Sequence, residues 1–477
     1  MPRTNDQELF MSSSATPQPE PLLEPRKPED PRLISYTQRR LWYLDQLTPG
    51  TGVYNVPYAM RIRGPLNVEA LQQAINKVIE RHEVLRTVFL APGGNPVPVL
   101  LKKFNAEIKQ YDLRNHPDRE AEAERITNAE AARAFNFARD LMFRASLVRL
   151  ADDEWILIHV AHHIATEFGS TVLIYQELSP LYEGFLTGNP VTLPPPKIQY
   201  ADFCLWQHRF LQGERLEKLT NYWVQQLSGA AQLNLPIDKP RPDVATLRGT
   251  RYPMVLPPEQ FVAIAKLSKA SGTTPFRGTC AAFDVFMQAY TGQDDISLGS
   301  PIAPRSSPGN YGAIGFFVNT LVLRSDVSGN PTFRELMLRV DKVVQGAIDH
   351  AGLTFDKLVE ALKPPREAGR MPLFQVNFRI LKAPVPALEL KGLEITPPRF
   401  VDTHTAKFDL ALELEATTGK SGFFEYSTDL FERSTVAQMA RDFEAVLSAL
   451  IADPDTPIQN VPAVRDIGQK MRAKRGR

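Results

Sequence analysis

Several features are scarce in this sequence of 477 residues, and each absence excludes a class of protein. The only two cysteines, Cys204 and Cys280, are far apart and each lies in an apolar setting. We therefore expect buried thiols in a reducing compartment and no disulfide framework. The formal net charge is +1, which gives no overall case for nucleic-acid binding. No apolar run is long enough to span a bilayer, and no basic-then-apolar signal pattern opens the chain, so we expect a cytoplasmic protein.

The length of the chain predicts two domains, because single cores rarely grow to this size. Serine, proline and charge are abundant up to residue 31, which predicts a disordered tail, either a solubilising leader or an arm that docks on another protein. Prolines recur in residues 233–247, which predicts a stiff linker. The expected order is a tail (1–31), an N-terminal half (32–232), a linker (233–247), a C-terminal half (248–464) and a basic tail (465–477). Strands mixed with helices in both halves predict α/β layers.

The most informative stretch joins a predicted strand to a predicted helix. Residues 155–161, which are apolar except for His159, predict a buried strand, and residues 170–186 predict a helix that ends at Gly188. His162 and His163 therefore lie between a strand end and a helix N-terminus. Backbone N–H groups and the helix dipole favour negative charge there. An imidazole beside such a site suits proton transfer during acyl chemistry.

Two other interpretations of these histidines remain open from the local pattern. A histidine pair at the end of a strand is commonly structural. His159, His163 and Glu167 are also spaced by four residues, as metal ligands on one face of a helix would be. The strand-like run through His159 argues against that helix, and so against a metal site.

Seven blocks of the sequence together form a recognisable series. They are SYTQRRLW (35–42), RHEVLRTVF (81–89), the His-His motif, YADFCLW (200–206), IGFFVNT (314–320), the weaker block 350–360 and RMPLF (370–374). In these blocks and their order the chain resembles, from about Ile34 to Pro462, the condensation domains of nonribosomal peptide synthetases. Several such blocks in order are specific for a family. The first two blocks, with residues 54–57 between them, look most like the subtype that joins an L-configured donor to an L-configured acceptor.

The resemblance implies an α/β fold of two chloramphenicol-acetyltransferase-like halves, which form a V-shaped pseudo-dimer with a central tunnel. It implies an acyltransferase-type enzyme that forms an amide bond between a carrier-bound acyl or peptidyl thioester donor and a carrier-bound aminoacyl acceptor. The expected partners are donor and acceptor peptidyl carrier proteins, which supply the phosphopantetheine arms. We expect a monomer that binds no cofactor, metal, nucleic acid or membrane. No short code in the sequence identifies the two substrates.

The family motif reads His-His-x-x-x-Asp-Gly, and the resemblance carries its roles onto this chain. It implies that His163 is the catalytic residue and that His162 is a structural neighbour. Glu167 takes the place of an Asp that pairs with an Arg from the second half, and the matching residue is Arg305. The residues agree with such a role for His163, because an amine with a pKa of about 8 in water must lose a proton as the amide forms. A neutral imidazole can accept that proton.

The sequence departs from the motif at Glu167-Phe168, where the family has Asp-Gly. Glu167 keeps the charge and adds a methylene. Phe168 removes the backbone freedom of a glycine, and Gly169 is expected to restore some of it. The ring of Phe168 either points into the tunnel and narrows a substrate channel, which its loop position favours, or packs in the core beneath the helix that starts at Ser170.

This departure leaves two classes of function. One is an active condensation enzyme with a reshaped pocket, which the intact His162-His163 pair favours. The other is a catalytically weakened domain that binds or recruits carrier proteins. Epimerisation, which uses a related motif, ranks third because the flanking blocks look like the condensation subtype. No adenylation or carrier-protein motif follows, so we expect a free-standing protein or an excised piece.

Overall fold

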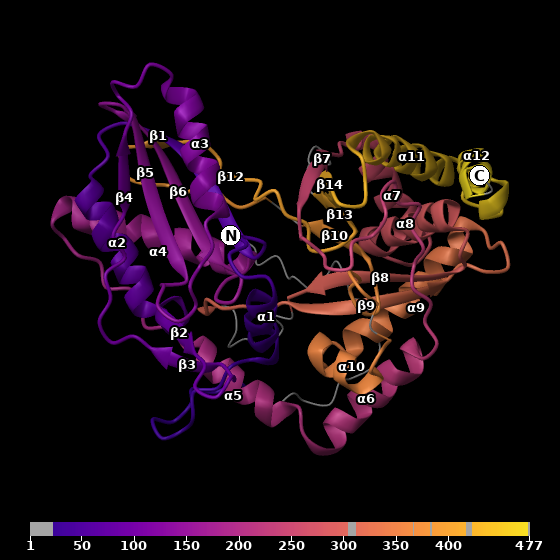
Figure 1. The fold of residues 1–477 in the computed structure, drawn as a ribbon, viewed down its shortest axis with the longest axis horizontal. Coiled ribbons are helices and arrows are strands. Elements are labelled where there is room, and N and C mark those ends of the chain that lie inside the picture. The colour runs from indigo at the N-terminus through magenta and orange to yellow at the C-terminus, as the bar shows by residue number, and fades with distance from the viewer. Residues whose placement is uncertain (1–21, 304–311, 366, 382–383, 416–421, 476–477) are drawn as a thin grey trace.

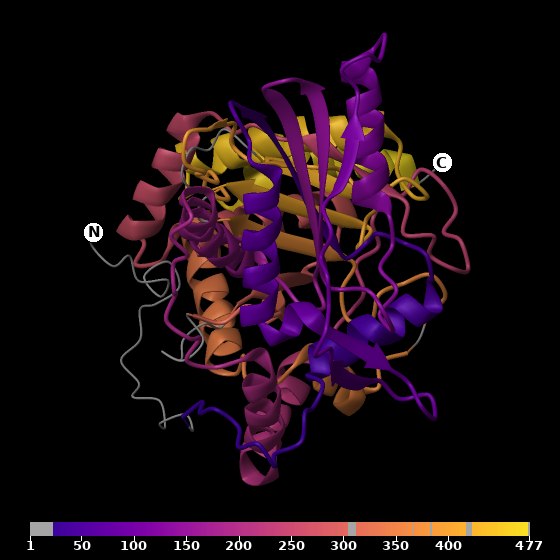
Figure 2. The same ribbon diagram turned by 90° about the vertical axis from the view of Figure 1, so that its left-hand side faces the viewer.

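The computed structural model describes residues 22–303, 312–365, 367–381, 384–415 and 422–475. Within these residues the chain forms two α/β lobes that stand side by side (Figure 1). Figure 2 looks onto the first lobe, whose sheet lies in front of the second lobe. Two helix-layered sheets are the α/β architecture that the sequence predicts.

The first lobe contains a six-stranded sheet with the order β11-β1-β6-β5-β4, and β12 also pairs with β1. Its strands are β1 (Asn55–Arg63), β4 (Lys109–Asp112), β5 (Phe143–Ala151), β6 (Glu154–His162), β11 (Glu394–Ile395) and β12 (Arg399–Phe400). Its helices are α1 (Tyr36–Leu47), α2 (Val68–Arg81), η1 (Glu83–Arg86), α3 (Arg119–Ala132), α4 (Phe168–Thr187) and α5 (Tyr200–Phe210). The hairpin of β2 (Thr87–Leu90) and β3 (Val97–Leu100) completes the lobe.

The second lobe contains a six-stranded sheet with the order β7-β14-β13-β10-β8-β9. Its strands are β7 (Gly249–Pro253), β8 (Asp295–Ile302), β9 (Asn319–Asp326), β10 (Val376–Leu381), β13 (Leu410–Glu415) and β14 (Gly422–Ser427). Its helices are α6 (Gly213–Leu227), α7 (Pro258–Ala270), α8 (Pro275–Thr291), α9 (Phe333–Asp349), α10 (Phe355–Leu362), α11 (Arg433–Ala452), η3 (Ile458–Asn460) and α12 (Pro462–Arg475). Every residue of α8 from Phe276 onward is buried, because α7, α9, α11 and α12 pack around it.

The strand and the helix that the sequence predicts on either side of the histidine pair are both present. β6 covers the predicted strand and pairs with β1 and β5 along its length. α4 begins at Phe168 and ends at Thr187, and its C-cap is Gly188, whose φ of 71° places it in the left-handed region that favours glycine. The two histidines therefore lie at the junction between a central strand and a long helix.

A segment from the second half of the chain crosses to the sheet of the first lobe. β11 pairs Ile395 with Ile62, and β12 pairs Phe400 with Tyr58. Leu388, Leu390 and Val401 are buried in the hydrophobic core of the first lobe. Figure 1 shows this segment, with β12, passing from the second lobe to the first. The second half of the chain thus contributes to both lobes.

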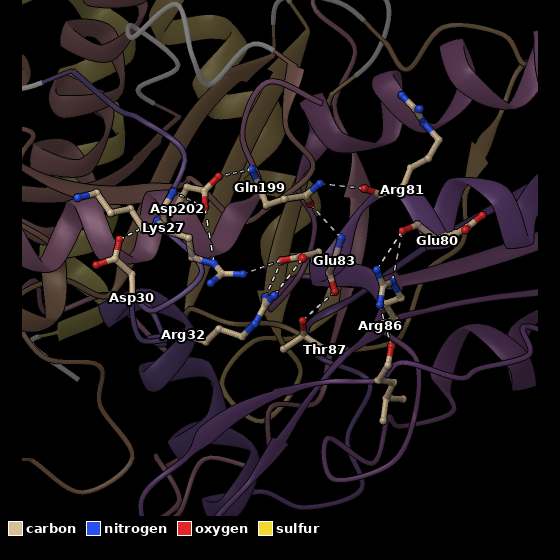
Figure 3. Close-up of polar contacts among 12 residues, drawn as sticks. Lys27, Asp30, Arg32, Glu80, Arg81, Glu83, Arg86, Thr87, Gln199 and Asp202 are labelled. Atoms are coloured by element: carbon tan, nitrogen blue, oxygen red, sulfur yellow. Dashed lines mark hydrogen bonds and ion pairs between the residues drawn. The ribbon is translucent and has the colours of Figure 1, made fainter. Parts of the chain in front are cut away.

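Residues 22–31 are held against the first lobe, so the predicted disorder is wrong for this part of the tail. The backbone N–H of Arg26 donates to Asp202 (3.1 Å), and the Arg32 guanidinium binds both carboxylate oxygens of Glu83 (2.6 and 3.0 Å). Figure 3 shows Gln199 beside Asp202 and Glu83, and its side chain accepts the N–H of Glu83 (3.0 Å). Charge pairing over long sequence distances orders this segment, and residues 1–21 lie outside the described residues.

The predicted basic tail at 465–477 is also wrong over most of its length. Residues 462–475 form α12, which packs against α8 and α11. Val464 and Ile467 are buried in the core of the second lobe, and Met471 packs against that core. Their helical spacing is masked in the sequence by the basic residues between them. No helix in the described part of the chain is both long and apolar enough to cross a membrane.

Candidate functional site

A tight turn after β6 fixes the position of His163. The carbonyl oxygen of His162 accepts the N–H groups of Ala165 (3.0 Å) and Thr166 (3.1 Å), and also the hydroxyl of Thr166 (3.0 Å). The N–H of His163 donates to the carbonyl oxygen of Tyr54 (2.9 Å), which precedes β1. The backbone of His163 is thereby held between the turn and the neighbouring strand.

The side chain of His163 is held as one tautomer. Its Nδ1 lies 3.1 Å from the carbonyl oxygen of Thr166, and a carbonyl oxygen only accepts, so Nδ1 carries the hydrogen. Nε2 is left with its lone pair. Burial, followed by the positive charge of Lys407, holds the pKa of His163 well below its usual value. The imidazole is therefore neutral near pH 7 and able to accept a proton at Nε2.

His162 has the contacts of a structural residue. Its Nδ1 accepts the N–H of Ile164 (3.0 Å). The ring lies 4.7 Å from the ring of Phe137 and 5.5 Å from that of Phe135, centroid to centroid. Burial is the main cause that lowers the pKa of His162 to about 3. The imidazole stays neutral and braces the turn that presents His163.

The motif's acidic position begins the helix that follows. Glu167 is the N-cap residue of α4 and is 2% exposed, with Ser170 fully buried one turn later. The hydroxyl of Ser170 donates to the carbonyl oxygen of Gly315 (2.9 Å) and accepts its N–H (3.1 Å). The first turn of α4 is therefore bound to a loop from the second half of the chain. Arg305, the expected partner of Glu167, lies outside the described residues.

The structure shows where Phe168 and Gly169, the two residues after Glu167, lie. The side chain of Phe168 is 39% exposed, so the alternative of a ring buried in the core beneath α4 is wrong. Gly169 lies within the first turn of α4, where the helical backbone suits any residue. The expectation that Gly169 supplies extra backbone freedom is therefore also wrong.

Sequence blocks that lie far apart meet around His163. Tyr200, at the start of α5, donates its hydroxyl to the carbonyl oxygen of Phe316 (2.6 Å) and is hydrogen-bonded to Ser35 (3.0 Å). The ring of Phe316 lies 5.5 Å from the imidazole of His163. Gln38 donates to the carbonyl oxygen of Ile164 (2.8 Å), in the turn that carries His163. Three of the seven blocks thus support the position of one side chain.

Sequence reasoning missed one charged residue of this site, Lys407, which lies between β12 and β13. Its Nζ is 5.1 Å from the ring centroid of Tyr54, the residue whose carbonyl holds His163. Burial is the main cause that lowers the pKa of Lys407 to about 8. A lysine in the apolar setting of Ala406 and Phe408 was the one available signal, and such a signal is weak.

His159, His163 and Glu167, whose spacing would suit a metal site on a helix, do not lie on one helix. His159 lies within β6, where its Nε2 is 2.5 Å from the hydroxyl oxygen of Tyr175. It therefore shares no helical face with His163. In the described ranges, no three His, Cys, Asp or Glu side chains are grouped so that they could hold a metal ion. Cys204 and Cys280 are both free and buried, as predicted.

Comparison with known proteins identifies the family of this chain. The model of the Condensation domain matches residues 29–471. Malpinin synthetase of Mortierella alpina is 38% identical over 427 residues, which are 89% of this chain and 6% of that protein. Phosphinothricin tripeptide synthetase PhsC of Streptomyces viridochromogenes is 37% identical over 466 residues, which are 96% of this chain and 42% of that protein. The chain thus spans less than half the length of either relative.

The solved structures agree in fold. The X-domain from teicoplanin biosynthesis matches with a TM-score of 0.85 at 25% identity, over 92% of this chain and 99% of that one. The first condensation domain of the calcium-dependent antibiotic synthetase matches with a TM-score of 0.75 at 21% identity, over 91% of this chain and all of that one. The two-lobed α/β fold that the resemblance implies is confirmed. This chain belongs to the condensation domain family, whose members are parts of the nonribosomal peptide synthetases of secondary metabolism.

Proposed function

We propose that this chain forms an amide bond between a carrier-bound acyl or peptidyl thioester and a carrier-bound aminoacyl acceptor. The observation that carries the proposal is the fixed tautomer of His163, with Nδ1 bound to Thr166 and Nε2 left to accept a proton. The acceptor amine attacks the thioester carbonyl carbon, His163 takes the proton that the nitrogen loses, and the donor arm leaves as a thiol.

Partners and subtype follow from the same proposal. The two thioesters arrive on the phosphopantetheine arms of a donor and an acceptor carrier protein. The blocks 35–42 and 81–89 support an L-configured donor and an L-configured acceptor.

A charged residue of the second block, 81–89, connects it to the helix after the His-His motif. Arg81 binds both carboxylate oxygens of Glu177 on α4 (3.0 and 3.1 Å). The block thereby fixes the helix that follows the His-His motif.

The experiment mixes this protein with a donor-loaded and an acceptor-loaded carrier protein and follows both by intact-protein mass spectrometry. We expect the acceptor carrier to gain the mass of the donor acyl group while the donor carrier loses it. The matched control omits the protein, because two thioesters and an amine also react slowly without a catalyst. No transfer above that background with any donor would contradict the proposal.

The second candidate is a domain that recruits other proteins without catalysis. Two observations favour it, namely Phe168 in place of the motif's glycine and the likeness to the X-domain, which is also described in a complex with OxyB. This candidate predicts that loaded carriers bind to the protein and that no product forms. Binding by calorimetry, run beside the mass-spectrometric assay, separates the two functions.

Glu167→Gln is expected to lower both thermal stability and activity. Glu167 is a buried carboxylate at the N-terminus of α4, and removing one partner of a buried ion pair costs about 3–5 kcal/mol. The matched control is Glu183→Gln on the same helix, whose half-exposed side chain pairs with Lys391. Such surface pairs contribute about 0–1 kcal/mol. If Glu167→Gln and its control melt alike and are equally active, the predicted pair with Arg305 does not exist.

Phe168→Gly is expected to change the range of accepted donors and to leave the fold intact. The ring is 39% exposed, so its removal leaves no buried cavity, and glycine in a helix costs only about 0.5–1 kcal/mol. If the ring narrows a substrate channel, bulky donors should react faster in Phe168→Gly, with Phe168→Leu intermediate. Turnover and melting temperature are measured on the same preparations. A large loss of melting temperature without a gain on any donor would contradict the channel interpretation.

A further inference from the structure

The lobe junction contains a lysine ammonium that the histidine mechanism does not use. Lys407 belongs to the connection between β12 and β13, in the second half of the chain. Its Nζ lies 5.1 Å from the ring centroid of Tyr54, in the first lobe. The backbone of Tyr54 holds His163, and the charge of Lys407 contributes to the low pKa values of His162 and His163. The ammonium is thus an electrostatic neighbour of the proposed catalytic base.

The carboxylate whose charge acts on Lys407 is bound to another cation. It belongs to Glu425 on β14, which pairs with Arg251 on β7 (3.2 Å). No carboxylate oxygen of the described residues lies within 4.0 Å of Lys407 Nζ. Its neighbour on the other side is the face of the Tyr54 ring, a weak partner for a cation. An ammonium in this setting lacks a strong counter-charge within the described structure.

The groups around Lys407 set the pH at which it loses its charge. Burial lowers its pKa to about 8, Glu425 opposes that effect, and Arg379 and Arg251 add to it. The first lobe contributes Tyr54, whose ring faces the ammonium, and the two neutral imidazoles of the motif. Lys407 is therefore mainly protonated near pH 7 and becomes neutral as the pH rises through about 8.

Resting on the proposed amide-forming function, we propose that the Lys407 ammonium binds the donor carbonyl oxygen and stabilises the negative charge that develops on it. When the amine lone pair forms the C–N bond, the electron pair of the C=O bond moves onto oxygen. His163 takes the proton from nitrogen. The C=O bond then re-forms, the C–S bond breaks, and the thiolate receives the proton from His163. These steps need no reactant other than the two substrates.

In this reaction, negative charge develops on the donor carbonyl oxygen. His163 is a neutral base and supplies no positive charge to the oxygen of the tetrahedral intermediate. A positioned cation stabilises such an oxyanion better than water does, since its own orientation is already fixed. Removal of one donor to an oxyanion typically costs about 10²–10³-fold in kcat. Lys407 and His163 thus divide the task between charge stabilisation and proton transfer.

The first test measures kcat against pH for the wild type, Lys407→Met and Lys407→Arg with loaded carriers. We expect Lys407→Met to lose about 10²-fold or more in kcat, with KM little changed, and Lys407→Arg to retain much of the rate. The ratio of the wild-type kcat to that of Lys407→Arg cancels the titration of the acceptor amine. That ratio should be constant below about pH 7 and fall above about pH 8, because the guanidinium keeps its charge. A ratio that does not change with pH would overturn the proposal.

The second test needs no turnover and so separates a failure of this proposal from a failure of the proposed function. The probes are a pantetheine phosphonate, which carries an anionic oxygen in place of the tetrahedral centre, and a neutral ketone of the same length. Calorimetry should show phosphonate affinity at least about tenfold lower in Lys407→Met, with ketone affinity unchanged. The control is Lys391→Met, in the crossing segment that precedes Lys407 and paired on the surface with Glu183. Equal losses for both probes, or no loss for either, would overturn the proposal even in a protein that forms no amide.

Discussion

His163→Ala is expected to reduce amide formation by about 10²–10⁴-fold, the range that a positioned general base contributes. The structure gives the reason: the turn after β6 holds the imidazole with its Nδ1 bound to Thr166 (3.1 Å) and its Nε2 able to accept. Alanine removes the base and leaves the backbone bonds of the turn in place. Single-turnover mass spectrometry of the loaded carriers measures the loss without interference from product release.

His162→Ala is the matched control for that variant. It deletes the imidazole that accepts the N–H of Ile164 (3.0 Å) and that packs between Phe135 and Phe137. It should therefore lower the melting temperature, whereas His163→Ala should change it little. A His163→Ala protein with near-native turnover would mean that proximity of the two substrates supplies most of the rate.

Gly315→Ala is expected to lower stability by about 1–3 kcal/mol, as overpacking of a filled core does, and activity by about 10²-fold. A Cβ at this position would lie 2.0 Å from the ring of Tyr200. That ring has little room to move, because it is 2% exposed and its hydroxyl is bonded to Phe316 and Ser35. The displaced loop would carry the ring of Phe316 away from His163, and misplacement by about 1 Å can cost 10²-fold in rate.

Gly312→Ala is the matched control for Gly315→Ala. It lies in the same segment, yet a Cβ there would meet nothing within 4 Å. Thermal melting and turnover of the two variants are compared under one set of conditions. Equal behaviour of Gly312→Ala and Gly315→Ala would show that the loop adapts and that the contact with Tyr200 does not position the site.

The central elements of the site were predictable because local pattern decides them. Residues 155–161 are apolar except for His159 and are bounded by turns, so β6 follows from sequence, and Gly188 marks the end of α4. β11 and β12 were not predictable, since each has two residues and no period shows over so short a length. Their pairing depends on β1, which is distant in the sequence.

The other features that the sequence did not predict depend on single charged residues. Lys407 has no motif around it, and its importance arises from the burial and the neighbours that the fold gives it. Arg26 lies in a proline-rich segment whose composition predicts disorder, and its ion pairs with Asp202 (3.8 Å) and Glu83 (4.0 Å) order it. In each case the energy that decides the outcome is a charge interaction between residues that are remote in the sequence.

Residues 384–401 cross from the second lobe to the first, and this crossing limits where the chain can be cut to separate or exchange the lobes. The predicted linker at 233–247 is not the boundary between the lobes, because α6 before it packs in the core of the second lobe. A cut there would also remove β11 and β12 from the first lobe and leave β1 as an open edge. Unpaired N–H and C=O groups on such an edge are a template for aggregation. A chimera that exchanges lobes between relatives must therefore inherit residues 384–401 from the same parent as the first lobe, although the chain reaches them only after most of the second.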